Sequence, residues 1–181
     1  NRITWDMRIK PPKVAKGVRP DFSGFAAPFV PEGTYRMVLT AGNKTVEGSL
    51  ELKVHPLTVH SKDDIAEQQD ASLKLFKMTE SLADIVDNIL YVQKEAQKII
   101  DEKKGDVDAA KELIDKLETI RKTLVATKEG GFLTGEEQLR EKISDVYTTI
   151  VYYNGKPNVS VMQRIPGLEG EIKDADNRTN E

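Results

Sequence analysis

The chain has 181 residues, of which 31% are charged and 38% apolar, and its net charge is −3 at pH 7. Acidic and basic residues alternate along the sequence, which is typical of a folded domain with solvated surfaces, so a disordered chain and a nucleic-acid partner are not expected. The sequence has no cysteine, which excludes disulfides, thiolate nucleophiles and thiolate metal sites.

The first stretch, "NRITWDMRI", alternates the apolar residues Ile3, Trp5 and Met7 with polar ones. This period of two predicts a strand with one buried face, anchored by Trp5. Residues 10–31 are rich in proline and glycine, which predicts a long connection with one short strand around residues 22–26. Because the chain starts at Asn1, within a predicted strand and without a methionine, we expect it to be a segment of a longer precursor.

The stretch "GTYRMVLTAGNKTVEGSLELKV" predicts a β-hairpin, because two alternating runs flank the turn residues "AGNK". A two-stranded hairpin is marginal in water, so we expect it to pair with the Trp5 strand and with others. "PEGTY" is similar to the tyrosine corner of immunoglobulin-like sandwiches. The residues expected on the inner face are Tyr35, Met37, Leu39, Leu50, Leu52 and Val54.

A helical period follows the link "HPLTVH". Ser61 and Asp64 form a capping box, and the predicted helix runs to about Lys104. Its apolar residues recur alternately every three and four positions, so it requires partner helices. They are Leu75, Met78, Leu82, Ile85, Ile89, Val92, Ala96 and Ile99.

Three further helices are predicted. The second begins after Asp106, and the third restarts at a capping box formed by Thr134 and Glu137. Pro166 and Gly167 are expected to break the fourth helix into two pieces with a frayed end. The expected buried residues are Ala110, Leu113, Leu117, Ile120 and Leu124 of the second helix, Leu139, Ile143, Val146, Ile150 and Tyr153 of the third, and Val161, Ile165, Leu168 and Ile172 of the fourth.

Together these elements predict an α+β protein of two units. Residues 1–57 form a small antiparallel immunoglobulin-like β unit whose first strands lie before Asn1. Residues 61–181 form an antiparallel, up-down bundle of three or four helices, because the connecting loops are short. No apolar run is long enough to span a bilayer, so no transmembrane segment is expected.

The order of "NRITWDMR", "PEGTYRMVLTAG" and "YYNGKPN" resembles the C-terminal region of large exported bacterial proteins with a sortilin-like β-propeller, often labelled as BNR-repeat glycosyl hydrolases. The shared motifs are structural, and include Tyr153, Gly155 and Pro157 at the end of the third helix. The chain departs from the pattern in the link, where relatives often carry Asp-Pro-Arg in place of residues 55–57. The resemblance implies export to the periplasm or cell surface and an upstream β-propeller in the same polypeptide as partner.

The sequence shows no catalytic motif: it lacks Asp-box turns, Gly-x-Ser-x-Gly and a phosphate-binding loop. Acidic residues such as Glu95, Asp101 and Glu118 occupy outward helix positions beside lysines, which predicts solvated faces. We therefore expect no catalytic, cofactor-binding or metal-binding residue.

Candidate metal sites fail for chemical reasons. Residues 101–112 begin and end with acids but lack the central glycine of an EF-hand loop. The acidic tail at residues 174–177 lacks the rest of such a loop. His55 and His60 are the only histidines, and no acidic cluster accompanies them in the sequence.

Three hypotheses on function stay open. The first is a non-catalytic C-terminal structural and interaction module of a larger exported protein. The second is a carbohydrate-binding accessory module of a glycoside hydrolase, because aromatic residues are concentrated in the β half, where core packing is the alternative role. The third is an oligomerisation or partner-docking role for the helices, with part of the apolar seam of the long first helix exposed. Other proteins and glycans are the candidate partners of the chain. The aromatic residues in question are Trp5, Phe22, Phe25, Phe29 and Tyr35.

Overall fold

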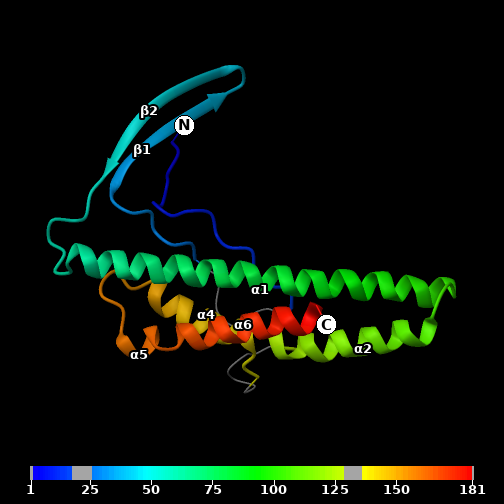
Figure 1. The fold of residues 1–181 in the computed structure, drawn as a ribbon. Helices are drawn as coiled ribbons and strands as arrows, with labels where there is room; N and C mark the ends of the chain where they lie inside the picture. Colours follow the sequence, from blue (N-terminus) through cyan, green and yellow to red (C-terminus); the bar gives the residue numbers. More distant parts are fainter. Residues whose placement is uncertain (1, 18–25, 129–135, 181) are drawn as a thin grey trace.

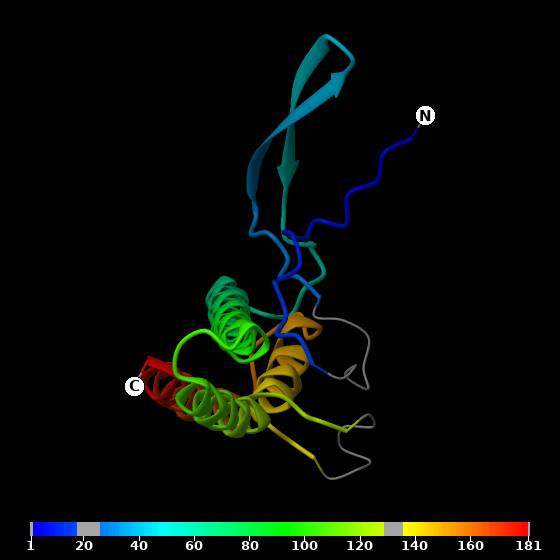
Figure 2. The ribbon, with the colours of Figure 1, turned by 90° about the vertical axis from the view of Figure 1, so that its right-hand side faces the viewer.

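The structure is a computed structural model that describes residues 2–17, 26–128 and 136–180. The described residues form an α+β protein, with a two-stranded antiparallel sheet followed by a set of packed helices (Figure 1). The predicted fold class is therefore confirmed at this level. The sheet projects away from the helices, as the turned view in Figure 2 shows.

The hairpin consists of β1 (Gly33–Ala41) and β2 (Lys44–Leu52), as predicted. The loop between the strands has two residues, and Gly42 has a φ of 61°, which glycine adopts without steric cost. The register pairs Tyr35 with Leu50 and Leu39 with Val46, so apolar residues of both strands share one face.

The predicted strand around Trp5 is wrong. Residues 2–9 form only one isolated β-bridge, between Arg8 and Phe29, and they do not extend the sheet. Met7 has a φ of 61°, a left-handed conformation that interrupts the alternation of a strand. Of the short strand predicted at residues 22–26, residues 22–25 lie outside the described residues, and Ala26 is not in a strand.

Helix α1 (Lys62–Glu102) confirms the predicted capping box and spans about 60 Å. The Ser61 hydroxyl accepts from the Asp64 N–H at 3.1 Å, and the Asp64 carboxylate accepts from the Ser61 N–H at 3.0 Å. The helix ends where Lys103 adopts a left-handed conformation.

Two helices return along α1, one after the other. Helix α2 (Val107–Leu124), capped by Asp106 as predicted, packs on the C-terminal half of α1, where Gln93 donates to the Ile114 carbonyl at 3.3 Å. Helix α4 (Leu139–Val151) packs on the N-terminal half, where Gln68 donates to the Ile150 carbonyl at 2.8 Å. Residues 125–138 therefore interrupt one return path, and the chain does not reverse there as a strict up-down bundle requires.

The predicted start of the third helix is wrong. Thr134 lies outside the described residues, and Glu137 precedes the helix, which begins at Leu139 with no side-chain hydrogen bond at its N-cap. Glu136 instead turns back to the end of the preceding segment. Its carboxylate accepts from the Thr127 N–H at 2.9 Å and from the Lys128 N–H at 2.8 Å.

The fourth helix forms two pieces, as predicted: α5 (Val159–Met162) and α6 (Ile165–Asn180). The break precedes Pro166, which lies in the first turn of α6, where a missing N–H costs no helical hydrogen bond. The prediction of a frayed end is wrong, because α6 is helical to Asn180 and Ala175 is fully buried. Ion pairs join α6 to its neighbours, such as Lys142 with Glu171 at 2.8 Å.

The core lies between α1 and the other helices, and most of the predicted apolar positions are buried. Among the predicted helical positions, Ile99, Leu113 and Tyr153 are exceptions, with exposures of 38%, 39% and 49%. Tyr147 is fully buried in place of Tyr153, and its hydroxyl donates to the Ala26 carbonyl at 2.5 Å.

A proline-rich strap (residues 10–17 and 26–28) lies across the bundle between α1 and α4. The Lys13 ammonium is 2.7 Å from Asp84 and 2.8 Å from Asp87 of α1. Ala15 is 4% exposed, and its carbonyl accepts from the buried Arg140 of α4 at 3.2 Å. Residues from the first predicted unit thus contribute to the core of the second. The division at residues 57 and 61 stays a prediction.

Candidate functional site

One face of the hairpin is apolar and largely uncovered. Met37, Leu39 and Val46 are exposed by 47%, 52% and 65%, and no described helix packs broadly on them. Tyr35 and Leu50, nearer the base, are partly buried. We call this surface the hairpin face, and it consists of Tyr35, Met37, Leu39, Val46, Leu50 and Leu52.

Both strands of the hairpin are also edge strands, because the described sheet contains only β1 and β2. Each strand presents a row of backbone N–H and C=O groups that its partner does not use, and such an edge pairs readily with another strand. An apolar face next to two open edges is a surface that can accept further strands.

A cluster around Arg8 connects the base of the hairpin to the bundle. The Arg8 guanidinium lies over the Phe29 ring at 3.6 Å and lies 5.6 Å from the Tyr152 ring at the end of α4. Its side chain also donates to the Ala27 carbonyl of the strap. The Trp5 indole N–H donates to the Arg8 carbonyl at 3.0 Å. We call these residues, together with Tyr35, the joint.

Tyr35, the residue of the predicted tyrosine corner, makes a local backbone contact. The Tyr35 hydroxyl donates to the Pro31 carbonyl, four residues upstream, at 2.6 Å. The Trp5 ring packs edge-on against Tyr35, with 5.6 Å between the ring centroids. These contacts fix the direction in which the hairpin leaves the joint.

The structure does not gather the candidate metal ligands of the sequence. His55 is exposed and accepts from the Leu57 N–H, whereas His60 packs against the Tyr153 ring with centroids 5.9 Å apart. Residues 101–112 span the end of α1 and the start of α2, and residues 174–177 lie within α6. Over the described part of the chain, no three His, Asp or Glu side chains are placed to hold a metal ion.

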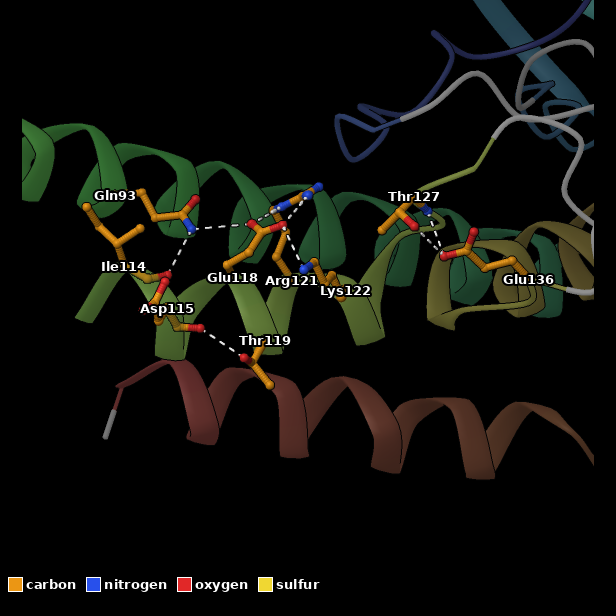
Figure 3. Close-up of polar contacts among 9 residues, drawn as sticks. All are labelled: Gln93, Ile114, Asp115, Glu118, Thr119, Arg121, Lys122, Thr127 and Glu136. Carbon is orange, nitrogen blue, oxygen red and sulfur yellow. Dashed lines mark hydrogen bonds and ion pairs between the residues drawn. The ribbon is translucent and has the colours of Figure 1, made fainter. Parts of the chain in front are cut away.

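Several carboxyl groups have a lowered pKa because neighbouring groups stabilise their ionised form; Figure 3 shows Glu118 and Glu136 with these partners. The Arg121 guanidinium binds both oxygens of Glu118 at 2.8 Å and lowers its pKa. Hydrogen bonds from the Thr127 backbone and hydroxyl lower the pKa of Glu136. The pKa is also lowered in Glu32, Asp64 and Asp87.

The described aromatic side chains of the β half already contact other groups of the protein. Trp5 is 41% exposed, but its ring edge and its N–H already have partners, and Arg8 covers one face of Phe29. Phe22 and Phe25 lie outside the described residues. Sequence reasoning missed Arg8, because it read that position as the polar side of a strand, and no local signal marks its two aromatic neighbours.

Comparisons with protein-family models, curated proteins and solved structures found no match to this chain. No helix in the described ranges is both long and apolar enough to cross a membrane.

Proposed function

We propose that this chain is a non-catalytic structural and interaction module, at the C-terminal end of a larger exported protein that resembles the BNR-repeat glycosyl hydrolases. The observation that carries the proposal is the hairpin face, where Met37, Leu39 and Val46 are about half exposed or more on a sheet with two open edges. Contiguous apolar exposure of this kind marks interaction surfaces.

In this proposal the hairpin is the last part of an immunoglobulin-like sandwich. Its other strands come from the polypeptide upstream, between a β-propeller and this chain. The hydrogen bond from Tyr35 to Pro31 supports the assignment, because the same bond defines the tyrosine corner of such sandwiches. Export to the periplasm or cell surface is part of the proposal and depends on the resemblance of the motifs alone.

The joint supports a positioning role for the helices. Arg8 contacts Phe29 next to the hairpin, Ala27 of the strap and Tyr152 at the end of α4. These contacts hold the hairpin in one orientation relative to the bundle. The bundle then supplies a rigid support about 60 Å long for whatever binds the hairpin face.

The carboxyl groups favour the same interpretation. A general acid for glycoside hydrolysis requires a raised pKa, whereas the partners of Glu118 and Glu136 lower theirs. We therefore expect the purified chain to leave aryl-glycosides and polysaccharides intact. Hydrolysis that disappears when particular carboxylates are replaced by amides would contradict the proposal.

Hydrogen exchange tests the strand-accepting role. We expect the outward-facing amides of β1 and β2 to exchange rapidly in this chain alone, because no third strand within the described residues covers them. They should become protected when the chain is produced together with the preceding part of its reading frame. The amides of α1 from Leu75 to Ile89 serve as the internal control and should be protected in both cases. Equal exchange of the hairpin in both proteins would contradict the proposal.

A second candidate, a carbohydrate-binding accessory module of a glycoside hydrolase, is favoured by one observation, the 41% exposure of Trp5. An exposed indole is a common sugar-binding surface. Titration with soluble polysaccharides, followed by tryptophan fluorescence, tests this candidate. Because Trp5 is the only tryptophan, a saturable change that is absent in unrelated proteins would support it, and an unchanged spectrum would count against it.

A further inference from the structure

A separate cavity lies in the helical half, where α4 ends and α5 begins. Its volume is about 340 Å³, at the lower end of the range of small-molecule sites. Gln68 of α1 forms one wall, and Ile150 of α4 and Val161 of α5 supply apolar surface. We call it the Gln68 cavity, and its lining includes Gln68, Thr149, Ile150, Lys156, Asn158 and Val161.

Gln68 is a buried amide with an unused acceptor. It is 6% exposed, and its NH₂ group donates to the Ile150 carbonyl at 2.8 Å and to the Ser72 hydroxyl at 3.2 Å. These two bonds fix the orientation of the amide, because a flipped amide would set its oxygen against the Ile150 carbonyl.

The Gln68 carbonyl oxygen accepts no hydrogen bond from the described residues. No fully buried side-chain polar atom in that part of the chain lacks a partner, so this oxygen keeps some accessible surface, and Gln68 is a lining residue of the cavity. A ligand that donates a hydrogen bond to an acceptor on a mostly buried side chain binds with a more favourable free energy.

Other lining residues supply donors. The Asn158 carbonyl oxygen accepts from the Ser160 N–H at 2.9 Å and the Ser160 hydroxyl at 2.8 Å, which leaves its NH₂ group available to a ligand. The Lys156 ammonium lies 3.7 Å from the Asp64 carboxylate, so its charge is already balanced. The cavity therefore offers an acceptor, donors and an apolar wall with little net charge.

This combination selects the chemistry of the ligand. An ionised carboxylate or a sulfate brings acceptors only and leaves the Gln68 oxygen unsatisfied, whereas a hydroxyl group both donates and accepts. The apolar wall of Ile150 and Val161 suits the C–H surface of a sugar ring. We propose that the Gln68 cavity binds a small neutral polyol, of the size of a monosaccharide or a terminal sugar unit. This site is independent of the proposed function, because none of its residues belongs to the hairpin face or the joint.

Titration of the whole chain, followed by the NMR signals of its backbone amides, tests the proposal. The probes are glucose, galactose, N-acetylglucosamine and inositol, each at millimolar concentration. We expect at least one to cause saturable shifts at Gln68, Ile150 and Val161. Acetate and sulfate, which bring acceptors only, should bind more weakly. Absence of saturable shifts with all four neutral probes would overturn the proposal, as would tighter binding of the two anions.

Asn158→Asp keeps the oxygen that caps Ser160 and removes the two N–H donors, so affinity should fall about tenfold. Asn88→Asp makes the same chemical change at an exposed position of α1 outside the lining, and should leave affinity unchanged. Thr149→Trp is a second variant, at an exposed lining residue, and should block the cavity without entering the core. If both cavity variants fold and bind as the unmodified chain does, the proposal is wrong.

Discussion

Single residues decide whether neighbouring segments can approach each other, and Gly155 shows this most clearly. A Cβ atom at this position would lie 2.2 Å from Nε2 of His60. The His60 ring in turn packs against Tyr153. The glycine thus allows the turn after α4 to pass directly over the residue that precedes the cap of α1.

We expect Gly155→Ala to lower the free energy of unfolding by about 1–3 kcal/mol, because the His60 ring must leave Tyr153. Urea denaturation measures the change. Gly167→Ala is the matched control, since its Cβ would meet open space in a helix, and should leave stability unchanged or raise it. The double variant Gly155→Ala, His60→Ala should recover part of the loss. No recovery would show that the steric explanation is wrong.

The Tyr35 hydroxyl is a second residue with a local and testable role. Tyr35→Phe removes its hydrogen bond to Pro31, worth about 1 kcal/mol, so exchange of the amides at the base of the hairpin should accelerate about fivefold. Tyr91→Phe removes a hydroxyl from an exposed tyrosine of α1 and should have no effect there. An unchanged hairpin in Tyr35→Phe would exclude the corner contact as a constraint.

Among the elements, two acidic side chains at the start of α4 and just before it accept hydrogen bonds from the segment that follows α2. Glu136 accepts from Thr127 and Lys128, and Glu141 accepts from the Ala126 N–H at 3.1 Å. Hydrogen bonds from Thr127 lower the pKa of Glu136 in the folded chain. The ionised Glu136 side chain therefore stabilises the fold fully at any pH above the pKa that Glu136 has in the unfolded chain. This stabilisation is lost as the pH falls through the lower pKa of Glu136 in the folded chain.

We therefore expect stability to decrease as the pH falls below about 4, and Glu136→Gln to show less of this decrease than the unmodified chain. Thermal unfolding between neutral and acidic pH measures the difference. Glu112→Gln, at an exposed position of α2, is the control and should keep the full decrease. Identical pH profiles for Glu136→Gln and the unmodified chain would contradict the assignment.

For the whole molecule, the strap makes the hairpin and the bundle depend on each other. Arg140 is 3% exposed, is 2.7 Å from the Glu141 carboxylate and donates to the Ala15 carbonyl of the strap. Gly17 of the strap passes so close to Arg140 that a Cβ there would lie 2.9 Å from the guanidinium. One buried cation thus joins α4 to the segment that leads toward the hairpin.

Arg140→Ala should cost about 3–5 kcal/mol, because it leaves the Glu141 carboxylate without its cationic partner in a mostly buried position. It should also make the strap more accessible to proteases. Arg164→Ala removes an exposed pair with Asp145 and should cost at most about 1 kcal/mol. Equal losses in the two variants, measured by urea denaturation, would contradict the role of Arg140.

Features that depend on partners a few residues away could be predicted from the sequence. The capping box at Ser61, the cap at Asp106 and the glycine turn of the hairpin are all present. The three-four spacing predicted most of the buried face of α1 for the same reason, since a helix places those residues on one side. The pattern also predicted the α+β class.

Features that depend on contacts between distant segments could not be predicted. The direction of α4, the burial of Ala15 and Tyr147, and the left-handed conformation of Met7 where a strand was predicted each follow from packing across more than one element. The cavity at Gln68 is of the same kind, because its walls come from α1, α4 and α5 and no short motif encodes it. The local sequence determines helix periods and caps, because these depend on backbone groups a few residues apart. Burial depends on which helix faces pack against each other, and the packing of the whole chain decides this.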